Sequence, residues 1–206
     1  MQYVDGGSQI KLGRQDMVCV LDEGTQGGQL LVGTGRLDGA GGEEIEALQG
    51  PAAVGGALAQ VAALLKGLPF ALMEAHEAIQ ASGTRAAWLP PLAVPHSLML
   101  AVYPGEGAKY VEHLDNDEQD PRTREGPVGQ RICDRAVTAI VYFNKDWCED
   151  KDGGCLRIQK PDGSGHVDVA PAAGRMVLFQ SKLVWHEVLP AFRRRWALSA
   201  WIPQQL

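Results

Sequence analysis

Residues 98–115 read LMLAVYPGEGAKYVEHLD and show the pattern that recurs through the second half of the chain. Two short runs of apolar and β-branched side chains flank a turn that contains Pro104, Gly105 and Gly107, which predicts two strands. Six more segments of this kind follow, separated by glycine, proline or aspartate. They are AVTAIVYFN (136–144), GGCLRIQ (153–159), HVDVAP (166–171), RMVLFQS (175–181), WHEVLP (185–190) and RRWALSAWIP (194–203).

Eight consecutive strands with no helical pattern between them predict a mainly β core over about residues 97–203. The expected architecture is a double-stranded β-helix, the jelly roll, or a related barrel. Because the helical patterns precede the strands, we expect an α+β chain whose helices, within about residues 43–81, support one of the sheets. The whole chain, 1–206, is then a single domain.

Helices are predicted ahead of the core. Over residues 52–66 apolar side chains recur at spacings of four and three, which predicts an amphipathic helix, and a less regular helix is expected over residues 70–81. Gly67 and Pro69 are expected to end the first helix. The residues at these spacings are Val54, Leu58, Val61 and Leu65.

Near the N-terminus a short strand is predicted over residues 15–22, QDMVCVLD, because apolar and β-branched residues gather there. The glycine-rich stretch GTQGGQLLVGTGRLDGAGG (24–42) follows it. Its composition is typical of a long loop.

The composition excludes several classes of function. The chain has 206 residues, is 45% hydrophobic and 21% charged, and carries a net charge of −6. An acidic chain is a poor ligand for the phosphate backbone, so nucleic acid is not an expected partner. The most apolar stretch, 52–73, is interrupted by Gln60, Lys66 and Pro69, so no membrane span is predicted. No secretory signal is seen either, and we expect the cytoplasm or the nucleus.

The four cysteines, Cys19, Cys133, Cys148 and Cys155, include no CxxC pair. A structural zinc site or a disulfide framework is therefore not expected, and free thiols are the simplest interpretation. A bridge between Cys148 and Cys155, which flank the turn EDKDGG, stays open.

Metal binding is suggested by His113 and Asp115. Side chains alternate between the two faces of a strand, so residues two apart point the same way and can grip one ion. With His186 as a third ligand they would form the two-histidine, one-carboxylate triad that leaves positions open on iron(II).

Spacing alone does not settle the choice of ligands. His166 and Asp168 repeat the HxD spacing and rival the first pair. His76 lies in a helix-like stretch, and His96 precedes the first strand of the core, so both are weaker candidates.

A resemblance separates these alternatives. The stretch 98–115, followed by AVTAIVYFNKDW, GGCLRIQ and WHEVLPAFRRRWALSAW, resembles the prolyl 4-hydroxylases of the iron(II) and 2-oxoglutarate dependent oxygenase superfamily. It is most similar to the oxygen-sensing enzymes that act on hypoxia-inducible factor. The resemblance covers about residues 97–203 and implies that iron is bound by His113, Asp115 and His186. Asp168 is then a structural or surface residue.

The resemblance also implies that Arg195 binds the distal carboxylate of 2-oxoglutarate, with Tyr103 and Tyr142 beside it. The residue types agree, because a guanidinium can bind a carboxylate through two parallel hydrogen bonds. Alternation places Arg195 on one strand face with small residues and Arg194 on the other face. Thr138, which shares a face with Tyr142, is expected in the same cosubstrate wall.

Residues near the substrate are implied as well. Arg14 and Asp16 resemble an arginine and aspartate pair that lies beside the substrate in this family. Arg135 and Trp201 match substrate-side positions. Residues 116–134 form a longer and more charged connection than the family usually has, which leaves the identity of the substrate open.

The implied activity is 4-hydroxylation of a prolyl residue in a protein or peptide, coupled to decarboxylation of 2-oxoglutarate to succinate. The implied requirements are Fe(2+), 2-oxoglutarate and O2, with ascorbate as reductant. One alternative is an oxygenase that acts on another residue or a small molecule. The other is a jelly-roll module that binds metal without turnover. The oligomeric state stays open.

Overall fold

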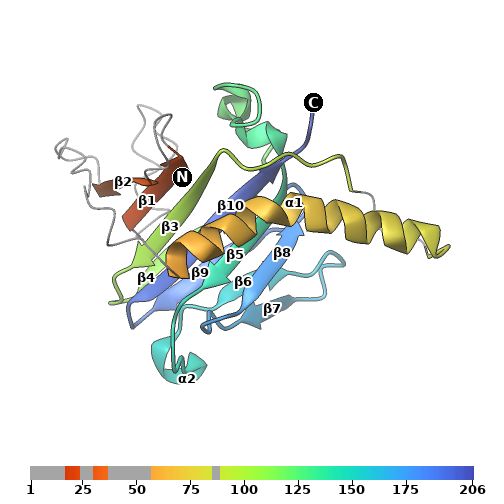
Figure 1. The fold of residues 1–206 in the computed structure, drawn as a ribbon. Helices are drawn as coiled ribbons and strands as arrows, with labels where there is room; N and C mark the ends of the chain where they lie inside the picture. Colours follow the sequence, from red (N-terminus) through yellow and green to blue (C-terminus); the bar gives the residue numbers. More distant parts are fainter. Residues whose placement is uncertain (1–16, 24–29, 37–56, 85–88) are drawn as a thin grey trace.

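The computed structural model describes residues 17–23, 30–36, 57–84 and 89–206, and shows two antiparallel sheets with a long helix across the larger one (Figure 1). The strand order is β2-β1-β3-β10-β5-β8 in the larger sheet and β4-β9-β6-β7 in the smaller. The strands are β1 Met17–Glu23, β2 Leu30–Arg36, β3 Ser97–Tyr103, β4 Ala108–His113, β5 Arg135–Tyr142, β6 Leu156–Gln159, β7 His166–Val169, β8 Met176–Gln180, β9 His186–Ala191 and β10 Arg195–Pro203. The α-helices are α1 Ala57–Ala81 and α2 Glu149–Asp152, and short 3-10 turns cover Pro121–Arg124 and Ile132–Asp134.

The predicted jelly-roll core is confirmed, and all eight expected strands are present as β3 to β10. Its interior lies between the two sheets, because each strand turns alternate side chains inward. The larger sheet contributes Ala101, Ile140 and Tyr142 to this core, and the smaller sheet contributes Leu156 and Val188. The candidate ligands and Arg195 project from the same inner faces.

The prediction of one long loop over residues 24–42 was wrong in part, because Leu30–Arg36 forms β2. It pairs antiparallel with β1, from Met17 opposite Arg36 to Glu23 opposite Leu30. Glycine has no side chain but keeps the backbone N–H and C=O groups that hydrogen-bond between strands. A glycine-rich segment can therefore pair with a neighbouring strand, here β1.

The prediction of two helices separated at Gly67 and Pro69 was also wrong, because α1 runs unbroken through both. A proline inside a helix removes one hydrogen bond and costs about 3 kcal/mol in an isolated helix. Here one face of α1 is buried at Ala62 and Leu65, against β-strand residues that include Leu198. Tertiary packing of that face offsets the cost. Residues 43–56 of the expected helical support lie outside the described residues.

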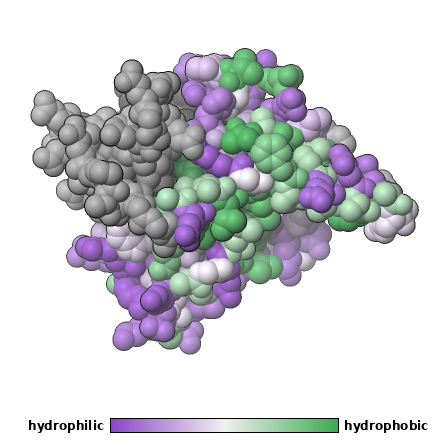
Figure 2. Space-filling model, in the orientation of Figure 1, coloured by the Kyte–Doolittle hydropathy of each residue, from purple (hydrophilic) through white to green (hydrophobic). Residues whose placement is uncertain are grey.

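The helix α1 is long and apolar enough, by length and composition, to cross a membrane over Leu58–Ala81. A core helix of a soluble protein passes the same test, so this is weak evidence. Leu64 and Phe70 are exposed on it, and Figure 2 shows hydrophobic surface along this part of the molecule. The absence of a membrane span stays a prediction.

The cysteines that the structure describes are free thiols. Cys148 is exposed while Cys155 is buried, and neither is bridged, so the pairing left open by the sequence does not form. The side chain of Cys19 lies outside the described residues.

Candidate functional site

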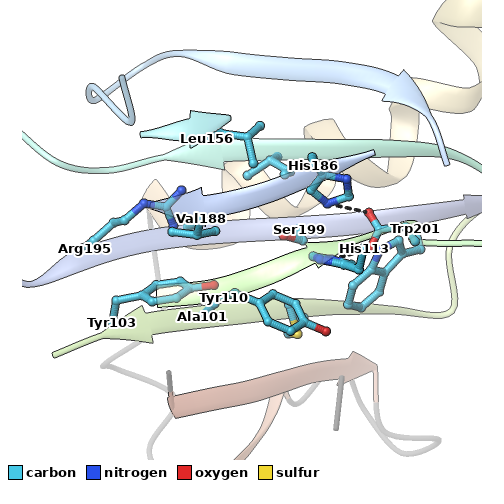
Figure 3. A pocket seen from close by; sticks show the side chains of 14 residues that line it. Ala101, Tyr103, Tyr110, His113, Leu156, His186, Val188, Arg195, Ser199 and Trp201 are labelled. Atoms are coloured by element: carbon cyan, nitrogen blue, oxygen red, sulfur yellow. Dashed lines mark ion pairs between the residues drawn. The ribbon is translucent and has the colours of Figure 1, made fainter. Parts of the chain in front are cut away.

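A cavity that is partly open to solvent lies between the two sheets. Its lining is mostly apolar, but polar groups gather at two places (Figure 3). One place holds His113, Asp115 and His186. The other holds Arg195 beside Tyr103.

The first group meets because β4 and β9 are neighbours in the smaller sheet, where His113 pairs directly with His186. Asp115 follows β4 and turns toward both rings. Its two carboxylate oxygens lie 3.6 Å from Nε2 of His113 and 3.7 Å from Nε2 of His186. All three ligand atoms lie within 4.8 Å of one another, so the group could hold a metal ion.

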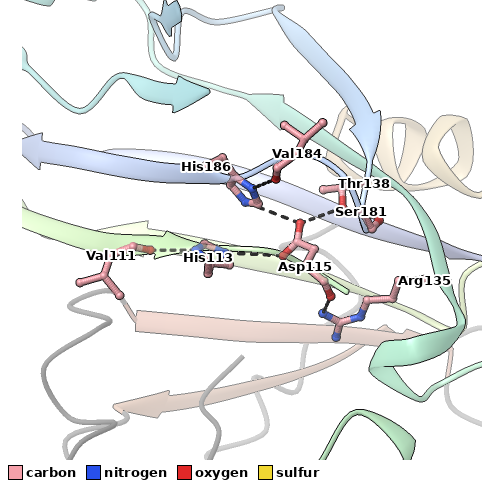
Figure 4. Close-up of polar contacts among 8 residues, drawn as sticks. All are labelled: Val111, His113, Asp115, Arg135, Thr138, Ser181, Val184 and His186. Atoms are coloured by element: carbon pink, nitrogen blue, oxygen red, sulfur yellow. Dashed lines mark hydrogen bonds and ion pairs between the residues drawn. The ribbon is translucent and has the colours of Figure 1, made fainter. Parts of the chain in front are cut away.

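Both imidazoles are oriented by backbone carbonyl groups. Nδ1 of His113 lies 2.8 Å from the carbonyl oxygen of Val111, and Nδ1 of His186 lies 3.0 Å from that of Val184 (Figure 4). A carbonyl oxygen only accepts, so each Nδ1 carries the proton and donates it. Each Nε2 is therefore left with a lone pair for a metal, the arrangement common at metal-binding histidines.

Asp115 is held by two further contacts, one of which is supported in turn by Ser181. The hydroxyl of Thr138 donates to its Oδ2 at 2.7 Å and lies 2.8 Å from the hydroxyl of Ser181. Nη1 of Arg135 donates to the backbone carbonyl of Asp115 at 3.2 Å. These contacts come from β5 and from the turn after β8, so the larger sheet fixes a ligand attached to the smaller one.

The electrostatics favour the forms that bind a cation. Burial alone would raise the pKa of Asp115, but the adjacent imidazoles of His113 and His186 and the positive charge of Arg135 outweigh it. The net result holds that pKa well below its usual range. Burial lowers the pKa of His186, so its ring is neutral at pH 7.

The rival pair lies elsewhere. His166 and Asp168 are on β7 at the edge of the smaller sheet, and both are exposed. Asp168 is engaged by Arg157, which donates two hydrogen bonds of 2.8 Å. His76 contacts Gln80 on α1, and His96 is exposed ahead of β3.

At the other place Arg195 is 2% exposed and lies in the cavity lining. Its guanidinium carbon lies 4.9 Å from the ring centre of Tyr103 and 5.0 Å from that of Tyr142. Among the residues that the structure describes, no carboxylate lies within ion-pair distance of it. A buried guanidinium is costly without an anion, so this end of the cavity suits the carboxylate of a ligand.

Tyr142 points to the same ligand. It is fully buried, and its hydroxyl has no hydrogen-bond partner among the described residues. Burial raises the pKa of this hydroxyl, and the positive charge of Arg195 opposes that rise only in part. A neutral hydroxyl beside a guanidinium could donate to one carboxylate together with it.

The structure places Thr138 differently from the expectation. It was expected in the cosubstrate wall, but its hydroxyl is taken up by Asp115 and Ser181. Neither Thr138 nor Tyr142 is among the residues that line the cavity. Alternation along β5 does put Thr138 on the same face as Tyr142, but Thr138 lies nearer the candidate metal ligands. The structure therefore shows Thr138 in contact with a candidate metal ligand.

The residues expected beside the substrate divide into two groups. Arg14 and Asp16 lie outside the described residues. Trp201 lines the cavity, and Arg135 packs its guanidinium 3.9 Å from the centre of the Trp201 ring. Arg135 itself is buried and does not line the cavity, but it contacts both Asp115 and Trp201, which do.

Several supporting residues could not be found from the sequence. The ring of Tyr110 lies 4.1 Å from that of His113, and the ring of Phe179 lies 4.7 Å from that of His186. Tyr110 carries a weak signal, because it lies three residues before His113. Ser181 carries none, since its contacts depend on how the turn after β8 folds.

Replacing Thr138 by valine should weaken metal binding by about 10- to 100-fold, the usual effect of losing a contact that orients a ligand. Valine keeps the shape of the side chain but leaves Oδ2 of Asp115 without its donor. Metal affinity can be measured by calorimetric titration with Mn(II) or Co(II).

The matched control is Thr123→Val. Thr123 is 1% exposed, and its hydroxyl has no hydrogen-bond partner among the described residues. This variant loses the same atoms without losing a contact to the site, and should bind metal as the unaltered protein does. Equal weakening by both changes would show that Thr138 acts only through stability.

The profile of the 2OG-Fe(II) oxygenase superfamily matches residues 98–203. The chain is 38% identical over 104 residues to a hypoxia-inducible factor prolyl hydroxylase of Caenorhabditis elegans, covering 50% of this chain and 13% of that protein. It is also 38% identical over 104 residues to the human Egl nine homolog 1, covering 50% of this chain and 21% of that protein. The chain thus spans less than a quarter of either relative.

Among solved structures, a prolyl-4-hydroxylase of Pseudomonas putida is similar over most of both chains. The two are 28% identical, with a TM-score of 0.56, and the match covers 95% of this chain and 75% of that one. The similarity therefore extends beyond the segment that carries the candidate ligands.

Proposed function

Because the chain belongs to the 2OG-Fe(II) oxygenase superfamily, we propose that it is an iron(II) and 2-oxoglutarate dependent dioxygenase that 4-hydroxylates a prolyl residue of a protein or peptide. One observation carries the proposal. A single cavity holds two histidines and an aspartate at one place and a buried arginine without an acidic partner among the described residues at another.

The candidate ligands fit iron(II). Nε2 of His113, Nε2 of His186 and a carboxylate oxygen of Asp115 would hold the ion, and three protein ligands leave the other positions open. Iron(II) with 2-oxoglutarate and O2 supplies the oxidative decarboxylation to succinate and the insertion of oxygen into a C–H bond. Ascorbate is proposed as the reductant that keeps the iron ferrous.

The opposite end of the cavity fits the cosubstrate. Arg195 and the unpartnered hydroxyl of Tyr142 would bind the distal carboxylate of 2-oxoglutarate, with Tyr103 beside them. Apolar walls formed by Leu156 and Val188 exclude water from the space between the carboxylate and the metal. Exclusion of water strengthens the pairing of the two charges.

The substrate would approach past Trp201, which lines the cavity near the candidate metal ligands and is held from behind by Arg135. A prolyl residue suits such a site, because its ring fixes φ and an extended proline-bearing segment loses little entropy on binding. The names of the similar proteins, which are prolyl hydroxylases, support this choice.

Two alternatives remain distinct. An oxygenase acting on another residue or a small molecule would use the same metal and cosubstrate ends of the cavity. A jelly-roll module that only binds metal would not need Arg195 buried beside Tyr142, so these two residues count against it.

We place the activity in the cytoplasm or the nucleus, in a single domain, with no nucleic-acid partner in view of the net charge of −6.

The substrate proposal predicts that the protein, supplied with iron(II), 2-oxoglutarate, ascorbate and O2, adds oxygen to proline in extended peptides. Mass spectrometry of a proline-bearing peptide library, with fragmentation to locate the added oxygen, measures this directly. A matched library in which alanine replaces every proline should remain unmodified.

Other outcomes separate the alternatives. Oxidation at residues other than proline would overturn the prolyl assignment and retain the oxygenase. Brisk succinate formation without any modified peptide would favour a small-molecule substrate. Metal binding with no decay of 2-oxoglutarate would favour the non-catalytic module.

A further inference from the structure

Arg195 is fixed from behind by residues 143–155, the segment between β5 and β6. Its Nε donates to the carbonyl oxygen of Gly154 at 2.8 Å, which leaves the terminal nitrogens for a ligand. Gly154 has a φ of +66°, and a methyl group on it would lie 3.2 Å from Cδ of Arg195 and 3.0 Å from Cβ of Ala191. The path of this segment therefore determines where the guanidinium lies.

Arg193, two residues before Arg195, binds this segment at several points. Nη2 of Arg193 donates to the carbonyl oxygen of Lys145 at 2.8 Å, and Nη1 donates to that of Asp146 at 3.3 Å. Its guanidinium carbon lies 4.6 Å from the ring centre of Trp147, and its Nε lies 3.5 Å from Oδ2 of Asp152. The Arg193 side chain thus joins Lys145 and Asp146 to Asp152, within the segment 143–155.

Asp152 and Trp147 complete the connection to Gly154. The carboxylate of Asp152 is buried and accepts a hydrogen bond of 2.9 Å from the backbone nitrogen of Cys148. The indole nitrogen of Trp147 donates to the carbonyl oxygen of Gly153 at 2.9 Å. The residue that contacts Arg195 is therefore tied on one side to this network and on the other to β9.

We infer that Trp147, Asp152 and Arg193 form a clamp that positions Arg195 and thereby sets the length of the dicarboxylate that the cavity accepts. The inference rests on the proposed function, because it takes Arg195 as the group that binds the distal carboxylate. An arginine side chain has many rotamers, and one that is held at its Nε can meet a carboxylate only at one depth. Loosening the clamp should let the guanidinium meet longer ligands.

The test compares Asp152→Asn and Arg193→Gln with Arg194→Gln. Asparagine can still accept from Cys148, so the first change removes mainly the attraction to Arg193. Arg194 is an exposed neighbour, and its change removes the same charge outside the clamp. Calorimetry on the Mn(II)-loaded protein measures the binding of 2-oxoglutarate and of 2-oxoadipate, which is one methylene longer, without needing turnover.

Both clamp variants should raise the Kd for 2-oxoglutarate by about tenfold, within the range typical of lost supporting contacts. The Kd for 2-oxoadipate should change much less, so the preference between the two diacids falls. Affinity for Mn(II) should be unchanged, and Arg194→Gln should behave as the unaltered protein does. Arg193→Lys, which keeps the charge near Asp152, should restore part of the preference.

Two results would overturn the inference alone. One is unchanged 2-oxoglutarate binding in both clamp variants. The other is an equal loss for both diacids together with a lower Tm, which would reveal a role in stability only. If the unaltered protein binds no 2-oxoglutarate at all, the proposed function fails and the clamp inference fails with it.

Discussion

Replacing His113, Asp115 or His186 with alanine should each abolish iron binding and the decay of 2-oxoglutarate. Loss of a contact that merely orients a ligand costs about 10- to 100-fold in metal affinity, so loss of a ligand should cost more than about 100-fold. These side chains face a cavity, and a smaller residue there leaves the sheets paired. Iron content by elemental analysis, with circular dichroism as a check on folding, measures both effects.

The matched control for this set is His166→Ala. His166 repeats the spacing of the first motif, but it is exposed on the edge strand β7, and its neighbour Asp168 is paired with Arg157. Iron content and turnover should therefore stay near those of the unaltered protein. If this change removes iron while His113→Ala does not, the ligand assignment is wrong.

Arg195→Ala should raise the 2-oxoglutarate requirement by about 100-fold, a ratio that corresponds to about 2.7 kcal/mol. Removing one partner of a buried, hydrogen-bonded charge pair costs roughly 2 to 5 kcal/mol, so the estimate lies in the lower part of that range. The metal group is built from other residues, and iron binding should persist. The measurement is the KM for 2-oxoglutarate together with iron content.

Two further variants test whether the effect on 2-oxoglutarate is specific to the guanidinium of Arg195. Arg194→Ala removes an equal charge from an exposed position and should leave the KM for 2-oxoglutarate unchanged. Arg195→Lys keeps the charge but cannot form the paired hydrogen bonds of a guanidinium, so it should fall between. Equal effects at Arg194 and Arg195 would contradict the strand register on which the assignment depends.

The core strands could be predicted because their signals are local. Each short apolar run bounded by turn residues is readable without knowing its neighbours, and all eight runs form strands. The boundaries of α1 could not be read in this way. Gly67 and Pro69 end a helix by local rules, whereas burial of Leu65 and Ala62 against the larger sheet depends on strands that come later in the chain.

In the candidate site, too, some residue positions follow from local patterns and others depend on tertiary packing. Alternation in β10 predicts that Arg195 and Trp201 face one way and Arg194 the other, and the structure places the first two in the cavity. Alternation also groups Thr138 with Tyr142 on β5. It cannot say that Thr138 lies against Asp115, since that distance depends on how the two sheets are stacked.

By itself, the sequence determined which strands exist and which side chains share a strand face, because both follow from the period of two along an extended chain. It left His113 and His166 as equals by spacing. Only the tertiary structure decided between them geometrically, by pairing β4 with β9 so that His113 meets His186, while β7 lies at the edge. The clamp behind Arg195 is likewise tertiary, because the hydrogen bonds that Arg193 and Arg195 donate to it join residues more than forty positions apart, which no local pattern records.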